Sequence, residues 1–199
     1  MHDDLLNLLP VRRGHFALES GHHGNLWLDL ERLFLVPERV RPYATELAAR
    51  LRVHDVQAVC GPLVEGAFVG LMVASVLGVP FTYSERITRE PSTKTLATDG
   101  LYPFAYRVPT VLRIELRGKR VAIVNDVINA GSAVRGTFDD LLACGAEPVA
   151  IGTLAVLGDW AATFVRENGL RIEVLASIPN PIWAPHECPL CAKALPLDR

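Results

Sequence analysis

Apolar residues alternate along the middle of the chain between short runs of strand length and longer stretches with helical spacing. The runs of strand length lie at 56–60, 80–83, 120–124, 148–157 and 171–178. The helical stretches lie at 37–53, 67–76, 132–144 and 159–167. Strands that alternate with helices in this way form βαβ units. The sequence therefore predicts an α/β fold with a central, mainly parallel sheet flanked by helices.

Three segments do not continue this alternation. The first 36 residues and the last 20 contain several glycines and prolines, and we expect them to cover one edge of the sheet. This divides the chain into an N-terminal part at 1–36, a core domain at 37–179 and a tail at 180–199 that packs on either of them. Residues 86–102 show no periodicity and are a candidate lid, because long loops in compact domains are usually functional. The stretch 102–116 favours extended structure.

Composition and charge narrow the class of protein. A chain of 199 residues fits one domain, since domains average roughly 150 residues. Its 20 basic and 22 acidic side chains give a net charge of −2, so no overall positive field attracts nucleic acid or an anionic membrane. Asp3 and Asp4 stand where a signal peptide carries basic residues, which predicts a cytoplasmic protein. Glycine, serine and proline interrupt the longest uncharged run, 66–84, so we expect no membrane span there.

The cysteines fall into two pairs. Cys60 and Cys144 lie in apolar surroundings typical of core residues. The tail places Cys188 and Cys191 at C-x-x-C spacing close to His186, which would supply three of the four ligands of a tetrahedral zinc ion. Because one ligand is missing, we expect reduced thiols and no zinc. The alternative is a structural zinc site completed by a ligand from elsewhere in the chain or from a partner chain.

Residues 121–135 carry the most chemistry. An apolar strand delivers Asp126 at its carboxyl end, and a loop of small residues leads to a helix with Ser132 in its first turn. Free backbone N–H groups at a helix start, a glycine that allows close approach and a hydroxyl group together suit a phosphate. Asp126 is suited to sugar hydroxyls or to a hydrated Mg2+. The alternative is an ordinary strand–turn–helix connection in which Ser132 only caps the helix.

This stretch resembles the phosphoribosyl pyrophosphate (PRPP) signature of type I phosphoribosyltransferases. Three further segments are similar to parts of the orotate phosphoribosyltransferase group. Residues 14–23 resemble its N-terminal G-x-F-x-L-x-S-G stretch, 60–67 its pyrophosphate loop, and 186–191 the E-x-C-P-L-C ending of some members. These four landmarks follow in order along most of the chain, which is identified as a divergent member of the family. The resemblance implies the type I phosphoribosyltransferase fold, in which the two terminal segments form a small hood.

The same resemblance implies an enzyme of nucleotide metabolism, related to pyrimidine biosynthesis. It would transfer the 5-phosphoribosyl group of PRPP to a nucleobase and release pyrophosphate. It would work as a homodimer, with Mg2+ that arrives bound to PRPP rather than to the protein.

The resemblance also implies site residues. Catalysis would involve Asp126 together with two cations of the lid region, Arg86 and Lys94. PRPP would be held by Asn125, Asp126, Val127, Ile128, Asn129, Ala130, Gly131 and Ser132, with its pyrophosphate on Pro62, Glu65 and Gly66. The base pocket would include Phe16, Ser20, Gly21 and Leu157.

Three positions near PRPP depart from the family pattern. Asn125 replaces the first of two acids, which removes a negative charge beside the ribose, and an amide is a weaker electrostatic partner than a carboxylate. Asn129 replaces a threonine, and its amide can still donate to a phosphate. Glu65 brings a carboxylate into the pyrophosphate loop, where Mg2+ or Arg86 would have to neutralise it, unless it turns outward or caps the next helix.

Two departures concern the base. Leu157 stands near the place where orotate-specific members carry an arginine for the orotate carboxylate, and Gly24 replaces a serine near the base-binding loop. We therefore expect orotate to be a poor acceptor and the base to be uncharged or differently substituted. The alternative function is a non-catalytic PRPP or nucleotide sensor that kept the fold and lost the chemistry.

Overall fold

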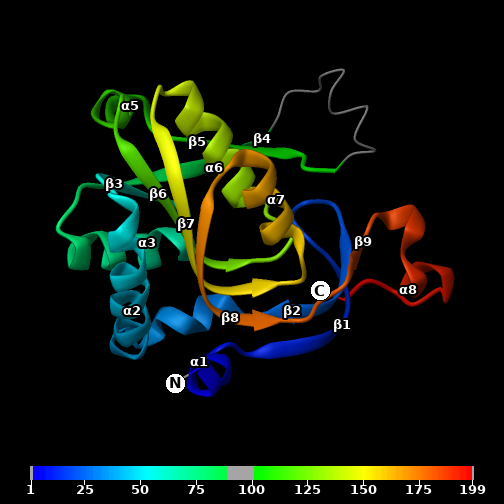
Figure 1. Cartoon of the computed structure of the whole chain (residues 1–199). Coiled ribbons are helices and arrows are strands. Elements are labelled where there is room, and N and C mark those ends of the chain that lie inside the picture. The colour runs from blue at the N-terminus through cyan, green and yellow to red at the C-terminus, as the bar shows by residue number, and fades with distance from the viewer. Residues whose placement is uncertain (1, 89–100, 199) are drawn as a thin grey trace.

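The computed structural model describes residues 2–88 and 101–198 (Figure 1). Its strands are β1 (Val11–Ala17), β2 (His23–Leu28), β3 (Ala58–Pro62), β4 (Phe81–Thr88), β5 (Phe104–Arg107), β6 (Arg120–Ile128), β7 (Glu147–Leu157), β8 (Arg171–Ile178) and β9 (Ile182–Trp183). Its α-helices are α1 (His2–Leu8), α2 (Arg41–Leu51), α3 (Glu65–Leu77), α5 (Thr110–Leu116), α6 (Ser132–Ala143), α7 (Trp160–Asn168) and α8 (Pro189–Ala192). Short 3-10 turns lie at Leu30–Leu35, Pro37–Arg39, Arg52–His54 and Pro185–Glu187.

A six-stranded sheet with the order β5-β4-β3-β6-β7-β8 forms the centre of the protein. Its strands run parallel from β4 to β8, while β5 runs antiparallel to β4 at one edge. This confirms the α/β fold with a central, mainly parallel sheet.

The order of the strands creates a switch point between β3 and β6. From β3 the chain moves outward through α3 to β4 and β5, and it then returns to β6 and continues in the other direction to β7 and β8. Neighbouring connections therefore leave the carboxyl ends of β3 and β6 in opposite directions. In open α/β sheets, ligands bind in the crevice that such a divergence opens.

Helices cover both faces of this sheet (Figure 1). Strand β6 shows how its residues divide between the two layers: Ala122 and Val124 belong to the core under α2 and α3, and Val121 and Ile123 to the core under α6 and α7. Successive side chains of a strand point to opposite faces, so a strand buried on both faces reads as a continuous apolar run. The apolar run at 120–124 is such a strand.

A second, three-stranded sheet joins the two ends of the chain. Its order is β1-β2-β9, and all pairings are antiparallel. We call this sheet, together with the N- and C-terminal segments that flank its strands, the hood. Leu26 and Leu28 of β2 pack into the same core as α2, so the hood is fixed to the larger sheet. The boundaries at residues 36 and 179 stay a prediction.

Two local expectations were wrong. The stretch 102–116 is extended only at β5, and it then forms helix α5 directly after Pro109, because Leu112 and Leu116 lie one turn apart and pack into the core under α6 and α7. Strand β6 does not end at Val124 but continues to Ile128, since β7 pairs with it as far as Ile128–Val156. Asp126 and its neighbours therefore lie on a strand and not in a loop.

The uncharged run at 66–84 forms most of α3, a turn at Gly78 and the start of β4. Within the two described ranges, no helix has the length and apolar character needed to cross a bilayer.

Candidate active site

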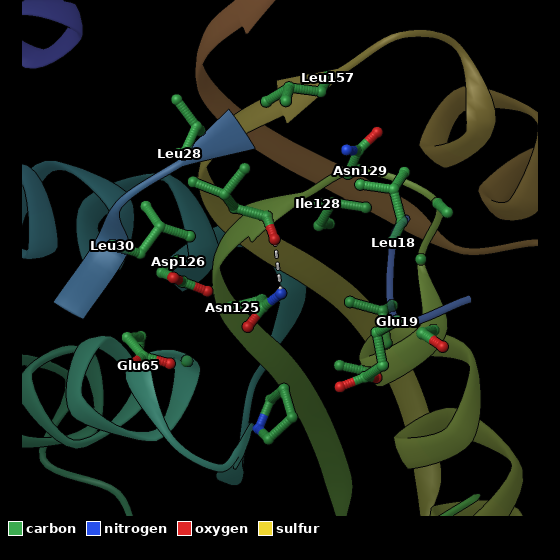
Figure 2. Close-up of a pocket in the computed structure, with 18 of the residues that line it drawn as sticks. Leu18, Glu19, Leu28, Leu30, Glu65, Asn125, Asp126, Ile128, Asn129 and Leu157 are labelled. Carbon is green, nitrogen blue, oxygen red and sulfur yellow. Dashed lines mark hydrogen bonds between the residues drawn. The ribbon is translucent and has the colours of Figure 1, made fainter. Parts of the chain in front are cut away.

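A cavity of about 380 Å³ opens at the switch point, beside the carboxyl ends of β3 and β6. The hood closes one side of it, and Figure 2 shows leucines of the hood opposite the acidic side chains of the sheet and α3. Of the sequence-predicted residues, those that line it are Pro62, Glu65, Gly66, Asn125, Asp126, Val127, Ile128, Asn129, Ala130, Gly131, Ser132, Ser20 and Leu157. The parallel sheet therefore brings both predicted loops to one cavity.

The turn between β6 and α6 has the form of an anion site. Gly131 has φ of 75°, and a Cβ built on it would overlap the Trp160 ring, so this position requires glycine. Ser132 begins the 12-residue helix α6, and its buried Oγ has no hydrogen-bond partner among the residues that the structure describes. An unpartnered hydroxyl beside the free N–H groups of a helix start is suited to phosphate oxygens.

Side chains from three segments hold this turn in place. The Tyr102 hydroxyl donates to the Ala130 carbonyl at 3.0 Å, and the Arg135 guanidinium lies 4.6 Å from the centre of the Tyr102 ring. Asn180 donates through Nδ2 to Asn129 Oδ1 at 3.1 Å. Since Asn129 Oδ1 is the acceptor, its own Nδ2 is left to donate toward the cavity.

Asn125 makes a hydrogen bond within β6 that a carboxylate could not make. Its Nδ2 donates to the Val127 carbonyl at 2.8 Å, and its Oδ1 occupies the space that a Cβ on Gly66 would need. A carboxylate has no hydrogen to donate to a carbonyl. The amide thus holds the end of β6, and its oxygen lies against Gly66 in the first turn of α3.

Asp126 is a buried acid of the cavity with a strongly raised pKa. It is 5% exposed, and burial raises its pKa to about 7. A hydrogen bond from the Val127 N–H opposes this shift, while the negative charges of Glu65 and Glu31 add to it. Glu65 is the first residue of α3 and lines the cavity near Asp126, as Figure 2 shows. Three carboxyl groups in one partly enclosed space favour the entry of a cation.

Arg86 does not lie where the neutralisation of Glu65 would need it. It sits on β4, donates through Nη1 to Glu19 Oε2 at 3.0 Å, and stacks 4.7 Å from the centre of the Phe104 ring. The other oxygen of Glu19 accepts a hydrogen bond from the Tyr106 hydroxyl at 2.8 Å. Lys94 lies, with most of the candidate lid, outside the described residues, so its predicted role rests on the sequence.

Leucines line much of the side of the cavity under the hood. Leu18, Leu28 and Leu157 surround it, as Figure 2 shows, and Leu157 is 3% exposed. Phe16 and Gly21 are not lining residues. Phe16 packs behind Trp27, with ring centres 5.8 Å apart, and Gly21 forms the turn between β1 and β2.

Sequence reasoning missed several residues of this cavity, namely Leu18, Glu19, Trp27, Glu31 and Tyr106. Leu18 and Glu19 belong to the N-terminal motif itself, and its fixed positions flank them. Trp27 and Glu31 lie at and just after the end of β2, and Tyr106 lies on β5; no pattern within one segment joins them to the PRPP loops.

The zinc candidate also needs correction. His186 is exposed and has Glu187 at 3.8 Å, and it is not grouped with the two tail cysteines. Cys188 and Cys191 instead face His15 and His23 of the hood strands. The local choice of the nearest histidine in sequence was therefore wrong.

Comparison with known proteins finds related sequences over most of the chain. A family model described as a phosphoribosyl transferase domain matches residues 41–176. The orotate phosphoribosyltransferase of Thermotoga petrophila is 30% identical over 189 residues, which cover 95% of this chain and 90% of that protein. That of Desulforamulus reducens is 30% identical over 183 residues, with coverages of 92% and 85%.

Solved structures show the same fold at lower identity. The orotate phosphoribosyltransferase of Aeropyrum pernix has a TM-score of 0.63 at 22% identity and covers 89% of this chain and 93% of its own. The APRTase of Giardia lamblia, complexed with 9-deazaadenine, has a TM-score of 0.67 at 16% identity, with coverages of 89% and 97%.

Proposed function

Because the chain belongs to the phosphoribosyl transferase domain family, we propose that its cavity binds PRPP and joins the phosphoribosyl group to an uncharged nucleobase. The observation that carries the proposal is the unpartnered Ser132 hydroxyl at the start of α6, next to Asp126 at the switch point. A phosphate and a sugar are the two groups that these elements suit.

We place PRPP across the cavity, between the turn after β6 and the loop after β3. Its 5′-phosphate lies on the turn from Asn129 to Ser132, and its ribose hydroxyls face Asp126. The pyrophosphate lies toward Pro62 and Gly66, at the end of β3 and the start of α3. Gly61 supports this loop, because a Cβ there would lie 2.7 Å from the backbone of Gly66 and Ala67.

Mg2+ suits the acidic part of the cavity. Carboxylate oxygens are the ligands that Mg2+ prefers in proteins, and Asp126, Glu65 and Glu31 gather there. The raised pKa of Asp126 reflects burial and unbalanced negative charge, which a cation relieves. Mg2+ bound to PRPP would neutralise pyrophosphate oxygens and make pyrophosphate a better leaving group. Glu65 would then meet phosphate groups whose charge is partly neutralised.

The protein contributes positioning and electrostatics to the reaction. The bond from C1 of the ribose to pyrophosphate breaks, a bond from C1 to a ring nitrogen of the base forms, and the proton of that nitrogen passes to solvent or to the departing pyrophosphate. Positive charge develops on the ribose during this exchange, so the nearby Asp126 carboxylate lowers the barrier. The helix start at Ser132 and the hood hold the two reactants in line.

The lining of the cavity favours a base without a carboxylate. Among the described residues that line it, none is lysine or arginine, and Glu19 on the hood side is already paired with Arg86, which is not itself a lining residue. The leucines around Leu157 suit a flat apolar ring, and Glu19 can accept a hydrogen bond from a ring or exocyclic N–H. A carboxylate-bearing base would lose its hydration there without gaining a cation.

A pyrophosphate-release assay over a panel of purines and pyrimidines tests this proposal. We expect Mg-PRPP to bind in calorimetry, at least one uncharged base to release pyrophosphate, and orotate to react at least ten-fold more slowly. Rapid turnover of orotate would contradict the base assignment. Binding of PRPP without release by any base of the panel would favour the non-catalytic sensor.

We also propose that the protein is a cytoplasmic homodimer. Apolar side chains are exposed around the start of α3, with Val64 and Leu71 each 54% exposed and Phe68 44% exposed. They lie on one face at helical spacing, and Leu35 adjoins the Phe34 ring that packs against Phe68. A contiguous apolar surface of this kind is typical of a subunit interface.

Leu71→Glu is expected to convert the dimer to monomers, because it places a charge in the centre of this apolar surface. The oligomeric state can be measured by light scattering coupled to gel filtration. Leu142→Glu is the matched control, since Leu142 is 51% exposed on α6, away from this face. Identical masses for the wild type and Leu71→Glu would contradict the assigned interface.

A further inference from the structure

Four metal-binding side chains meet where the tail crosses the hood. His15 comes from β1 and His23 from β2. Cys188 directly precedes α8, and Cys191 lies within it. One ligand atom from each lies within 4.8 Å of all the others. In Figure 1 these elements are the blue strands β1 and β2 and the red tail segment around α8. Segments more than 160 residues apart in sequence therefore form one cluster.

The spacing of these atoms fits a tetrahedral metal ion. His15 Nε2 lies 3.0 Å from His23 Nδ1 and 3.5 Å from Cys188 Sγ, and Cys191 Sγ lies 3.7 Å and 3.2 Å from the two histidine nitrogens. Zinc binds sulfur at about 2.3 Å and nitrogen at about 2.0–2.1 Å, so tetrahedral ligand atoms lie roughly 3.3–3.8 Å apart. These four distances fall in or just below this range, and the other two pairs of ligand atoms lie within the 4.8 Å that bounds the whole cluster.

The hydrogen-bond partners of His15 point to the same conclusion. Its Nδ1 lies 2.9 Å from the Leu195 carbonyl, which can only accept, so Nδ1 carries the proton. In the neutral ring, Nε2 then presents one lone pair to three neighbours at once. One lone pair cannot serve three hydrogen bonds, but it can serve one metal ion at the centre. A metal-binding histidine typically has its other nitrogen fixed in this way.

The surroundings of the cluster are ordered around it. Cys188 is 3% exposed, and the backbone N–H groups of Leu190 and Cys191 hydrogen-bond its sulfur. On the other side, the His15 N–H donates to Asp198 Oδ2 at 2.7 Å, and the Asp198 N–H donates to the His15 carbonyl at 2.6 Å. Contacts of this kind around metal-binding residues hold those residues in position and are characteristic of structural metal sites.

We propose that His15, His23, Cys188 and Cys191 bind one structural Zn2+ that fastens the tail to the hood. Two thiolates and two imidazoles in a tetrahedron are a donor set that selects zinc, and four protein ligands leave no open position for catalysis. The turn between His15 and His23 carries Leu18, Glu19 and Ser20, which line the cavity. The metal therefore fixes the hood side of the pocket from behind.

Metal analysis of the full chain, purified without chelator, tests the proposal. We expect about one zinc per chain, and replacement by Co2+ should give the intense visible absorption of tetrahedral cobalt with thiolate ligands. Cys191→Ser is the informative variant, because Cys191 is exposed and its replacement leaves the core intact. It should lower the zinc content and weaken the cobalt spectrum.

His186→Ala is the matched control. It removes the histidine nearest to the two cysteines in sequence, which the structure places outside the cluster, so this variant should keep full zinc content. Two results would overturn the proposal: a reduced wild-type protein that takes up neither Zn2+ nor Co2+, or a His186→Ala variant that loses metal as Cys191→Ser does. Both readouts are independent of PRPP and of the base.

Discussion

Asp126→Asn is expected to lower kcat/KM for PRPP by about 10²–10³-fold and to make the folded protein more stable above pH 7. Loss of one preorganised electrostatic group from an active site typically has an effect of this size on catalysis. The variant keeps the shape of the side chain and an oxygen that can accept from the Val127 N–H. It removes only the negative charge that faces the ribose.

The gain in stability follows from the pKa of Asp126. Burial raises this pKa from 3.8 to about 7 in the folded protein. Between these two values the folded protein holds a proton that the unfolded chain has lost, so the free energy of unfolding falls as the pH rises through this window. Above pH 7 the full destabilisation is present. The amide of the variant has no charge to bury, so the free energy of unfolding of the variant lacks this fall with rising pH.

Two measurements check the prediction. Urea unfolding at pH 5 and pH 8 should show a larger gain for the variant at the higher pH, of roughly 1–3 kcal/mol. The rise of wild-type kcat/KM with pH near 7 should be absent from the variant. Glu115→Gln is the control, because it removes an exposed carboxylate of α5 remote from the cavity. A variant with wild-type kcat/KM, or one less stable at pH 8, would contradict the assignment.

Gly131→Ala is expected to weaken PRPP binding by at least ten-fold and to destabilise the fold by roughly 2–4 kcal/mol. Its φ of 75° is unfavourable for a residue with a Cβ. The added atom would also overlap the Trp160 ring, which is stacked on Phe164 with ring centres 4.7 Å apart. The ring cannot move aside without disturbing α7, so the phosphate turn itself must shift.

Gly118→Ala separates the effect of the positive φ from the effect of the overlap with Trp160. Gly118 has a similar φ of 70°, but nothing lies within 4 Å of the position that its Cβ would take. This control should cost only about 1 kcal/mol and leave PRPP affinity unchanged. Denaturant unfolding and calorimetry with Mg-PRPP measure both quantities. Equal effects of the two variants on PRPP affinity would show that the turn after β6 does not hold the phosphate.

The α/β core and the meeting of the two PRPP loops could be predicted because both follow from local patterns. Apolar runs such as 120–124 show strands buried on both faces, and the carboxyl ends of parallel strands share one edge of a sheet. Glu65 and Ser132 lie 67 positions apart, yet both line the cavity for this reason. The end of β6 was harder to predict, because its length depends on pairing with β7.

Side-chain partners from distant segments could not be predicted. The sequence suggested that Asn125 is a weakened acid, whereas the structure uses its amide as a donor to the Val127 carbonyl. The zinc ligands illustrate the same limit. A C-x-x-C pair indicates metal chemistry, but only the antiparallel pairing of β1 and β2 brings His15 beside His23, and only the path of the tail brings them to the cysteines.

The hood sheet also has a consequence for the order of events during synthesis. Strand β9, at Ile182–Trp183, completes a sheet begun by β1 and β2, which are synthesised long before it. The loops after β3 and β6 can reach their positions before then, but the hood sheet on the base side of the pocket is completed only once β9 has been synthesised. A nascent or truncated chain would therefore meet PRPP before it could distinguish one base from another.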